Sequence, residues 1–317
     1  MEGISVKLDV VVIGLLNIDL IIRGTAPTDL ETLLTWTGES EIECLTAGSV
    51  GYFIQNLAKL GVKTGIITTI ADDSFSLIIK KTLTDAGVDI SKLKSQKNTK
   101  SAIGIYMLLF GNKKRPMTFR MMTHDPMPTS FLDEDLEYIF NSRLLHIGGY
   151  LHFPQKELIG NLIKKAKNNG VQISMDPQFP LQPLDKPWLK AMPSLEDIDI
   201  LFVDENEVLG LTNTTSITSA VKILLDKGIK IIAVKLGEKG CLVCNHSKLI
   251  QKPAIPVDNI IDSIGAGDSF DCGFVTGFLE GLSLNQMTNL ALKVAASSLK
   301  GVGGSSSIRP RNAIILD

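Results

Sequence analysis

Short apolar runs alternate with helical stripes that close on glycine, and this alternation most constrains the fold of the chain. Between the runs, apolar residues recur with helical spacing, as in 50–60 before Gly61. Strands that are apolar throughout are typical of parallel sheets covered by helices on both faces. The sequence therefore predicts an α/β fold with a mainly parallel sheet. Its expected strands lie at 9–14, 64–70, 144–147, 171–175, 200–203 and 231–236.

Composition excludes several function classes. The chain has 317 residues, of which 44% are hydrophobic and 21% charged, so it is not a disordered protein. A formal net charge of −2 argues against nucleic acid as the main partner. There is no apolar run long enough to span a membrane and no signal peptide, so no membrane partner and a cytoplasmic location are expected. Four cysteines do not make a disulfide framework.

Two segments interrupt the alternation. Residues 23–45 are polar and have no helical stripe, and residues 101–121 are expected to form two strands around a turn at 111–114. A strand pair inserted into an α/β chain predicts either a small β-lid over the site or an ordinary surface hairpin.

The motif DSIGAGD, Asp262 to Asp268, carries the strongest chemical signal because it stands at the head of a helix predicted over 266–281. Gly265, Ala266 and Gly267 would present backbone N–H groups to an anion at the positive end of that helix. Asp268 would either partner the helix dipole or accept a proton from a hydroxyl that attacks a bound phosphate.

The segment DSIGAGDSFDCGFVTG resembles the C-terminal signature of the PfkB (ribokinase-like) sugar and nucleoside kinases, and further blocks in the same order extend the resemblance over nearly the whole chain. The resemblance implies one ribokinase-like domain over 1–317. Its fold would be a three-layer α/β sandwich with a mainly parallel central sheet and a β-lid inserted at about 20–46 and 101–123. ATP and Mg²⁺ are the implied cofactors, and a homodimer through the lid is the implied assembly.

Two blocks of the sequence correspond to the substrate-binding motifs of the family. The block GLLNID, residues 14–19, resembles the first strand and its polar exit, which implies that Asn17 and Asp19 bind sugar hydroxyls; a turn-capping pair is the alternative. Gly48 and Gly61 are separated by the same interval as the corresponding glycines of the family. Tyr52 replaces a usual Asn and either stacks on a ring or fills space.

Several other positions depart from the family pattern. In 71–76, which resembles G-D-D-x-x-G, Asp72 is best interpreted as the cap of a helix, whereas Asp73 is either part of such a capped helix start or a functional residue. The departures leave open whether specificity is changed or activity is lost. Besides Tyr52 they are Ala47, Ala71, Ser76 and Gln178.

The remaining blocks correspond to the nucleotide and to metals. The motif DENE resembles N-x-x-E and implies that Glu207, with Asp204 acting through water, organises Mg²⁺; an acidic helix start is the alternative. The motif KLGEKG resembles the family's T-L-G-x-x-G loop. The implied nucleotide-binding residues are Lys235, Gly237, Gly240, Asn289 and Ala296. The implied ligands of a monovalent cation such as K⁺ are Asp262, Ile264, Leu299, Gly301 and Ser305.

The sequence thus predicts an ATP-dependent phosphotransferase that phosphorylates a hydroxyl of a small sugar or sugar derivative. Asp268 would be the base, and the backbone of 265–267 would stabilise the transferring phosphoryl group. A nucleoside kinase and a non-catalytic sugar- or nucleotide-binding member of the family are the alternatives.

Overall fold

The computed structural model describes residues 7–24, 29, 31, 34–35, 40–108, 117–121, 128–180 and 184–314. Within them, a nine-stranded sheet has the order β13-β12-β11-β10-β9-β8-β1-β4-β5. The strands from β5 to β11 are parallel, and β12 and β13 add an antiparallel edge. The bounds are β1 Leu8–Ile13, β4 Thr64–Ala71, β5 Asp89–Gln96, β8 Ser142–Gly148, β9 Gln172–Asp176, β10 Ile200–Asp204, β11 Ile231–Lys235, β12 Cys241–Cys244 and β13 Leu249–Lys252.

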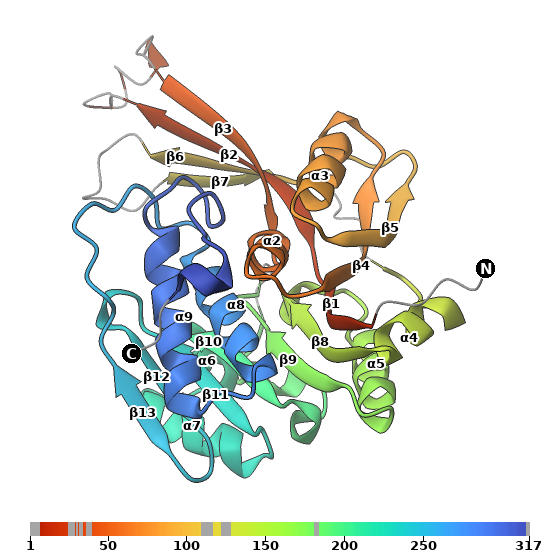
Figure 1. Cartoon of the computed structure of the whole chain (residues 1–317), viewed down its shortest axis with the longest axis vertical. Helices are drawn as coiled ribbons and strands as arrows, with labels where there is room; N and C mark the ends of the chain where they lie inside the picture. The colour runs from red at the N-terminus through yellow and green to blue at the C-terminus, as the bar shows by residue number, and fades with distance from the viewer. Residues whose placement is uncertain are drawn as a thin grey trace.

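Helices cover both faces of this sheet and complete three layers (Figure 1). Strand β1 illustrates why: Val11 and Ile13 enter one buried apolar cluster, whereas Val10 and Val12 enter the other. The predicted α/β sandwich is confirmed. One face carries α4 Asp133–Phe140, α5 Lys156–Asn168, α6 Glu205–Thr212 and α7 Ile217–Asp226; the other carries α2 Gly51–Lys59, α3 Ser74–Asp85, α8 Ala266–Leu279 and α9 Leu284–Ser298.

A second sheet forms the lid at the top of Figure 1. Its order is β3-β2-β6-β7, with β2 Leu16–Gly24, β3 Ser40–Gly48, β6 Ile103–Leu108 and β7 Met117–Met121. Strand β2 starts two residues after Gly14, because the chain passes almost directly from the central sheet into the lid. The lid therefore starts earlier than the expected position near 20, and the expected turn at 111–114 lies outside the described residues.

Asp73 joins the lid to the body. Its Oδ1 accepts hydrogen bonds from the N–H groups of Phe75 and Ser76, both at 3.1 Å, and so caps α3. The same carboxylate accepts bonds from the N–H and Oγ of Ser101, which stands two residues before β6, both at 2.8 Å. The expectation that Asp72 caps this helix is wrong, because the neighbouring Asp73 has the extended backbone that a cap requires.

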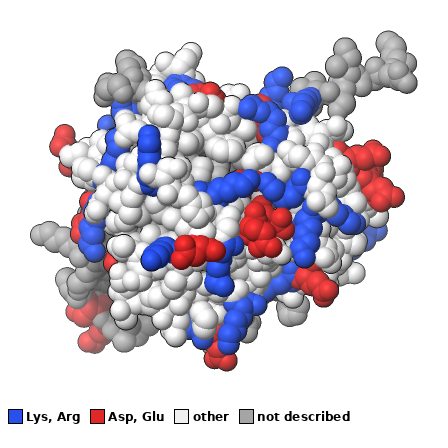
Figure 2. Space-filling view, turned by 90° about the horizontal axis from the view of Figure 1, so that it is seen from below, with Lys and Arg blue, Asp and Glu red and all other residues white. Residues whose placement is uncertain are grey.

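No single helix of the described residues is long and apolar enough to cross a membrane, and only the bent pair α6 and α7 reaches the required length and composition. Val208, Leu211 and Leu224 of that pair are buried in the core. On the face in Figure 2, basic and acidic side chains are interspersed among broad uncharged areas.

Candidate active site

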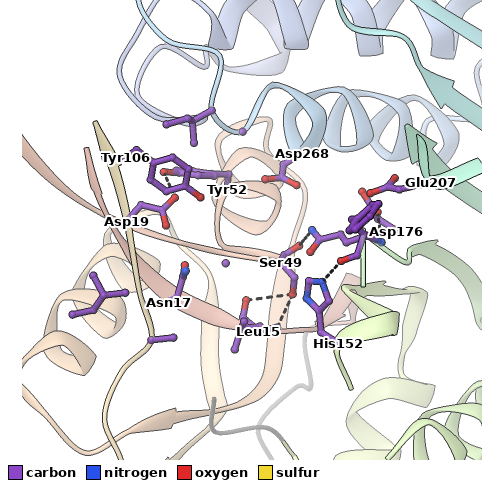
Figure 3. A pocket seen from close by; sticks show the side chains of 17 residues that line it. Leu15, Asn17, Asp19, Ser49, Tyr52, Tyr106, His152, Asp176, Glu207 and Asp268 are labelled. Atoms are coloured by element: carbon purple, nitrogen blue, oxygen red, sulfur yellow. Dashed lines mark hydrogen bonds between the residues drawn. The ribbon is translucent and has the colours of Figure 1, made fainter. Parts of the chain in front are cut away.

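A cavity of about 310 Å³ lies between the lid and the carboxyl ends of the central strands. Its walls come from lid strands β2 and β6, the start of α2, the segments after β8, β9 and β10, and the start of α8. Figure 3 shows side chains from these separate elements pointing toward one space. Of the residues predicted from the sequence, the lining contains Asn17, Asp19, Gly48, Tyr52, Glu207, Ile264, Gly265 and Asp268.

Glycines at the start of α8 let two loops touch. Gly265 has φ +74° and directly precedes the helix, which begins at Ala266. A Cβ on Gly265 would lie 2.6 Å from the Cα of Gly304, and a Cβ on Gly304 would lie 2.7 Å from the Cα of Gly265. The helix end therefore faces the cavity with bare backbone, and its first N–H groups have no partners within the helix. Such a helix start is suited to bind an anion.

Asp268 stands in the first turn of α8 and points into the cavity (Figure 3). The pKa of its carboxyl is raised to about 7, mainly by desolvation; the charge of Lys235 lowers this pKa, and the charges of Asp176 and Asp19 raise it. A carboxyl with this pKa releases and accepts a proton near neutral pH, which suits a general base.

Tyr52 and Asp19 form one unit on the other wall. The Tyr52 hydroxyl donates a hydrogen bond to Asp19 Oδ2 at 3.2 Å, and each residue is 2% exposed. The Tyr52 ring packs on Gly265 and Gly303, where a Cβ would lie 2.8 Å and 3.3 Å from its atoms. Of the two interpretations of Tyr52, filling space between glycine loops is the one that this packing supports.

Two further residues shape the same wall. The Oδ1 atom of Asn17 is buried and has no hydrogen-bond partner among the described residues, so a bound ligand is a suitable donor for it. Gly48 has φ +105°, and a Cβ there would lie 2.4 Å from the carbonyl oxygen of Leu15. Only glycine fits this close approach of β3 to the beginning of β2.

Glu207 reaches the cavity from α6, but Asp204 does not line it. Asp204 caps the helix by accepting a bond from the Glu207 N–H at 2.8 Å, and Glu207 Oε2 accepts one from the Asp204 N–H at 2.7 Å. Desolvation, followed by the charge of Asp176, raises the pKa of Glu207 to about 8. The described residues contain no cluster of three side chains that could hold a metal. The Glu207 carboxylate, which lines the cavity, fits Mg²⁺ that is held mainly by water and substrate oxygens.

The expected nucleotide residues lie outside the cavity lining. Lys235, at the end of β11, forms ion pairs with Asp176 at 2.7 Å and Asp271 at 3.0 Å. Gly240 has φ +92° and is so close to the backbone of β13 that a Cβ would lie 2.0 Å from the oxygen of Lys252. Gly237 starts the short 3₁₀ turn before Gly240, Asn289 Oδ1 accepts a bond from Lys252 Nζ at 2.6 Å, and Ala296 is a partly exposed residue of α9.

Comparison with known proteins decides the family. The profile described as "pfkB family carbohydrate kinase" matches residues 7–311. This chain belongs to the pfkB family. It is thus a carbohydrate kinase of that family, a phosphotransferase with a ribokinase-like fold.

Relatives in the pfkB family act on different acceptors. The chain is 26% identical over 314 residues to ribokinase of Arabidopsis thaliana, covering 96% of this chain and 79% of the relative. It is 27% identical over 315 residues to cytidine kinase of Thermococcus kodakarensis, covering 93% and 98%. The structure of Arabidopsis thaliana ribokinase complexed with ribose and ATP matches with a TM-score of 0.79 at 24% identity, covering 97% of both chains.

Three of the residues expected to bind a monovalent cation, Asp262, Leu299 and Ser305, accept hydrogen bonds from other groups of the protein. Asp262 accepts bonds from the N–H groups of Ile264 and Gly303, and the carbonyl of Leu299 accepts one from Ile261. The ammonium of Lys59 donates to the carbonyl of Ser305. A positive charge of the protein therefore stands beside one expected ligand, the carbonyl of Ser305. Gly301 lies in the same loop and donates its N–H to Ser298.

Tyr106 and Phe179 also line the cavity, and no signal in the sequence pointed to them. Asp176, from a segment that resembles the family's D-x-N block, and His152, for which a structural role was expected, line it as well. His152 follows Gly148 and Gly149 at the carboxyl end of β8, so its place after a predicted parallel strand was an available signal. Gln178, one of the departures from the family, has φ +56° and donates from Nε2 to the Ser49 carbonyl at 3.3 Å. This left-handed backbone is uncommon for residues other than glycine.

Proposed function

We propose that this pfkB-family kinase transfers the γ-phosphoryl group of ATP to a hydroxyl of a small sugar or sugar derivative. The observation that carries the proposal is Asp268, a carboxyl with a pKa of about 7 at a glycine-lined helix start, in the same cavity as Asn17 and Asp19. These groups supply a base, an anion-binding backbone and acceptors for hydroxyl hydrogens. The ribokinase relative supports a sugar as acceptor.

The proposed reaction uses few groups. Asp19 and Asn17 hold the acceptor so that one hydroxyl lies beside Asp268, which takes its proton as the oxygen bonds to the γ-phosphorus. The bond from that phosphorus to the β–γ bridging oxygen breaks, and ADP leaves. The N–H groups at 265–267 stabilise the charge on the transferring group. Mg²⁺ would neutralise phosphate charge, with Glu207 beside it and Asp204 as the cap that orients Glu207.

The lid has a role in this proposal. Tyr106 of β6 and Asp19 of β2 both line the cavity, so the lid sheet forms part of the acceptor site. Closure of the lid over a bound acceptor would exclude water and limit the hydrolysis of ATP. Within the described lid sheet β3 is an edge strand, and its Ile42 side chain is 62% exposed; this edge is the surface we propose for a homodimer. We also infer a cytoplasmic location, where ATP is available.

A nucleoside is the second candidate acceptor. Tyr106 and Phe179 add aromatic surface to the cavity wall, and the cytidine kinase relative is 27% identical. Tyr52, by contrast, is packed between glycine loops and donates its hydroxyl to Asp19, so a stacked base does not rest on it. The intact Asp268 and helix start argue against a non-catalytic binding protein.

The experiment is ADP formation with Mg²⁺ over a panel of sugars, sugar acids and nucleosides. Asp268→Asn should lower turnover by about 10²- to 10⁴-fold, because a general base contributes about that much. Asp226→Asn, an exposed residue at the end of α7, is the matched control and should leave turnover unchanged. Turnover of Asp268→Asn at the wild-type rate would contradict the role of Asp268. Sedimentation at micromolar concentration tests the homodimer.

A further inference from the structure

A buried cluster of three ionisable side chains lies beneath the start of α8. Lys235 Nζ is 2.7 Å from Asp176 Oδ2 and 3.0 Å from Asp271 Oδ2. The side chains of Lys235, Asp176 and Asp271 are 15%, 6% and 1% exposed. The three residues come from β11, β9 and α8, so one ammonium group connects two strands of the central sheet to a helix.

Stability alone does not account for this cluster. Moving charges out of water costs several kcal/mol per ion, and apolar replacements of buried ion pairs are often neutral or stabilising. Asp271 lies inside α8, and its Oδ1 is buried with no hydrogen-bond partner among the described residues. A costly and incompletely satisfied carboxyl group suggests that the cluster serves the site above it.

The position of Lys235 relative to α8 indicates how the cluster affects the site. A Cβ on Gly267 would lie 3.6 Å from Lys235 Nζ and 3.7 Å from its Cδ, so the lysine packs directly against the first turn. Asp268 is in this turn, and Asp271 follows it by three residues, which places both on neighbouring positions of the helix surface. Asp176, the other partner of the ammonium, lines the cavity.

We propose that Lys235 is a positioning residue, whose ion pairs with Asp176 and Asp271 hold the first turn of α8, and with it Asp268, in register with β9. This inference rests on the proposed kinase function. It differs from the role expected from the sequence, in which Lys235 contacts the nucleotide. Both of its observed partners are carboxylates of the protein.

Four variants separate these roles. Lys235→Met removes the ammonium, and Asp271→Ala removes one of its two carboxylate partners. Asp271→Asn keeps an oxygen that can accept a hydrogen bond from the lysine. The double variant Lys235→Met/Asp271→Ala completes a double-mutant cycle. Lys230→Met is the matched control, because Lys230 also pairs with a buried carboxylate, Asp199, at 2.6 Å, but before the opposite end of β11. The measurements are kcat, the KM of ATP, the affinity for Mg²⁺·ATP by calorimetry, and thermal stability.

Positioning predicts that Lys235→Met and Asp271→Ala each lower kcat by about 10- to 100-fold, the size expected for a small misplacement of a reacting group. The double variant should be no slower than the worse single variant, because both break one connection. Asp271→Asn should recover most of the rate. Nucleotide affinity should change by less than threefold, and Lys230→Met should keep the wild-type kcat.

Other outcomes overturn the inference. A tenfold or greater loss of Mg²⁺·ATP affinity in Lys235→Met, with Asp271→Ala unaffected, would make Lys235 a phosphate ligand instead. Lower thermal stability with wild-type kcat in both variants would make the cluster merely structural. If the wild-type protein phosphorylates no acceptor, the proposed function fails and positioning of a base fails with it; calorimetry with Mg²⁺·ATP then still shows whether Lys235 is a phosphate ligand.

Discussion

The hydroxyl of Tyr52 donates a hydrogen bond to Asp19 Oδ2 at 3.2 Å, so a residue of α2 orients a carboxylate that belongs to the lid. Burial, followed by the charge of Asp19, holds the pKa of Tyr52 well above its usual value, and the phenol therefore remains a donor. This arrangement fixes one Asp19 oxygen and restricts how an acceptor hydroxyl can approach the other.

Tyr52→Phe tests that arrangement, because it keeps the ring between Gly265 and Gly303 and removes only the hydroxyl. Hydrogen bonds to charged groups contribute about 1.5–3 kcal/mol, so we expect the KM of the acceptor to rise by about 10- to 100-fold. The KM of ATP should change by less than twofold. Steady-state kinetics with each substrate varied in turn provide the measurement, and equal effects on both KM values would contradict the assignment.

The pH dependence of the reaction should follow Asp268. With a pKa of about 7, the base is protonated below neutrality, so kcat/KM should rise with pH to a plateau above about pH 8. The pH–rate profile of the wild-type protein between pH 5 and 9 provides the measurement. A flat profile over this range would mean that Asp268 keeps the ordinary Asp pKa of 3.8 or does not limit the rate.

The same pKa makes a prediction about stability. Between about pH 4 and pH 7 the folded protein keeps a proton on Asp268 that the unfolded chain has released, so this group's contribution to the free energy of unfolding falls as pH rises. Asn cannot ionise. Asp268→Asn should therefore match the wild-type protein near pH 4 and be the more stable of the two at pH 8, as measured by urea unfolding at both pH values.

A methyl group at Gly265 should disturb both folding and turnover. The residue has φ +74°, and a Cβ would lie 2.6 Å from Gly304 Cα, so Gly265→Ala should lower the free energy of unfolding by more than about 2 kcal/mol. Gly61→Ala is the control, because Gly61 has φ +87° but nothing within 4 Å of a new Cβ. It should cost only the backbone strain of about 1–2 kcal/mol. Equal losses in the two variants would show that the contact with Gly304 is unimportant.

We predict that turnover does not require K⁺, because the ammonium of Lys59 already places a positive charge beside an expected cation ligand. This ammonium donates to the Ser305 carbonyl, so replacing K⁺ by Na⁺ or a large organic cation should change kcat by less than twofold. Lys59→Met removes that charge and should lower stability by about 1–3 kcal/mol, as a carbonyl loses its buried donor. Strong activation of the wild-type protein by K⁺ would contradict this prediction.

The layers of the fold could be predicted from the sequence, because the spacing of apolar residues along the chain indicates directly which side chains are buried. The helix expected over 266–281 is α8 at Ala266–Leu279, and the run at 231–236 is β11 at Ile231–Lys235. The cap at Asp73 was misassigned to its neighbour, because both residues are acidic and only the backbone conformation distinguishes them. The start of the lid at Leu16 was hidden, because β2 continues an apolar run without a turn signal.

Residues of the site could be predicted only where they belong to a local sequence motif. The start of α8 and the pair Asn17 and Asp19 do lie on one cavity, as local patterns at strand and helix ends suggest. The ion pair of Lys235 with Asp271 could not be foreseen, because it depends on how a strand end meets a helix 36 residues later. The roles of Asp204 and Glu207 could not be separated by sequence, since both are acidic and only the structure shows that Asp204 is the cap and Glu207 is in the first turn of the helix.

The contact between Gly265 and Gly304 limits how this protein can be recombined with its relatives. Two backbones meet where neither residue has a side chain, so a bulkier residue on one loop cannot be offset by trimming the other. A chimera that takes the DSIGAGD segment from one parent and the 299–305 loop from another keeps this fit only if both parents have glycine at the contact. The two loops are therefore best inherited together, although 39 positions separate the contacting residues in the chain (304 − 265).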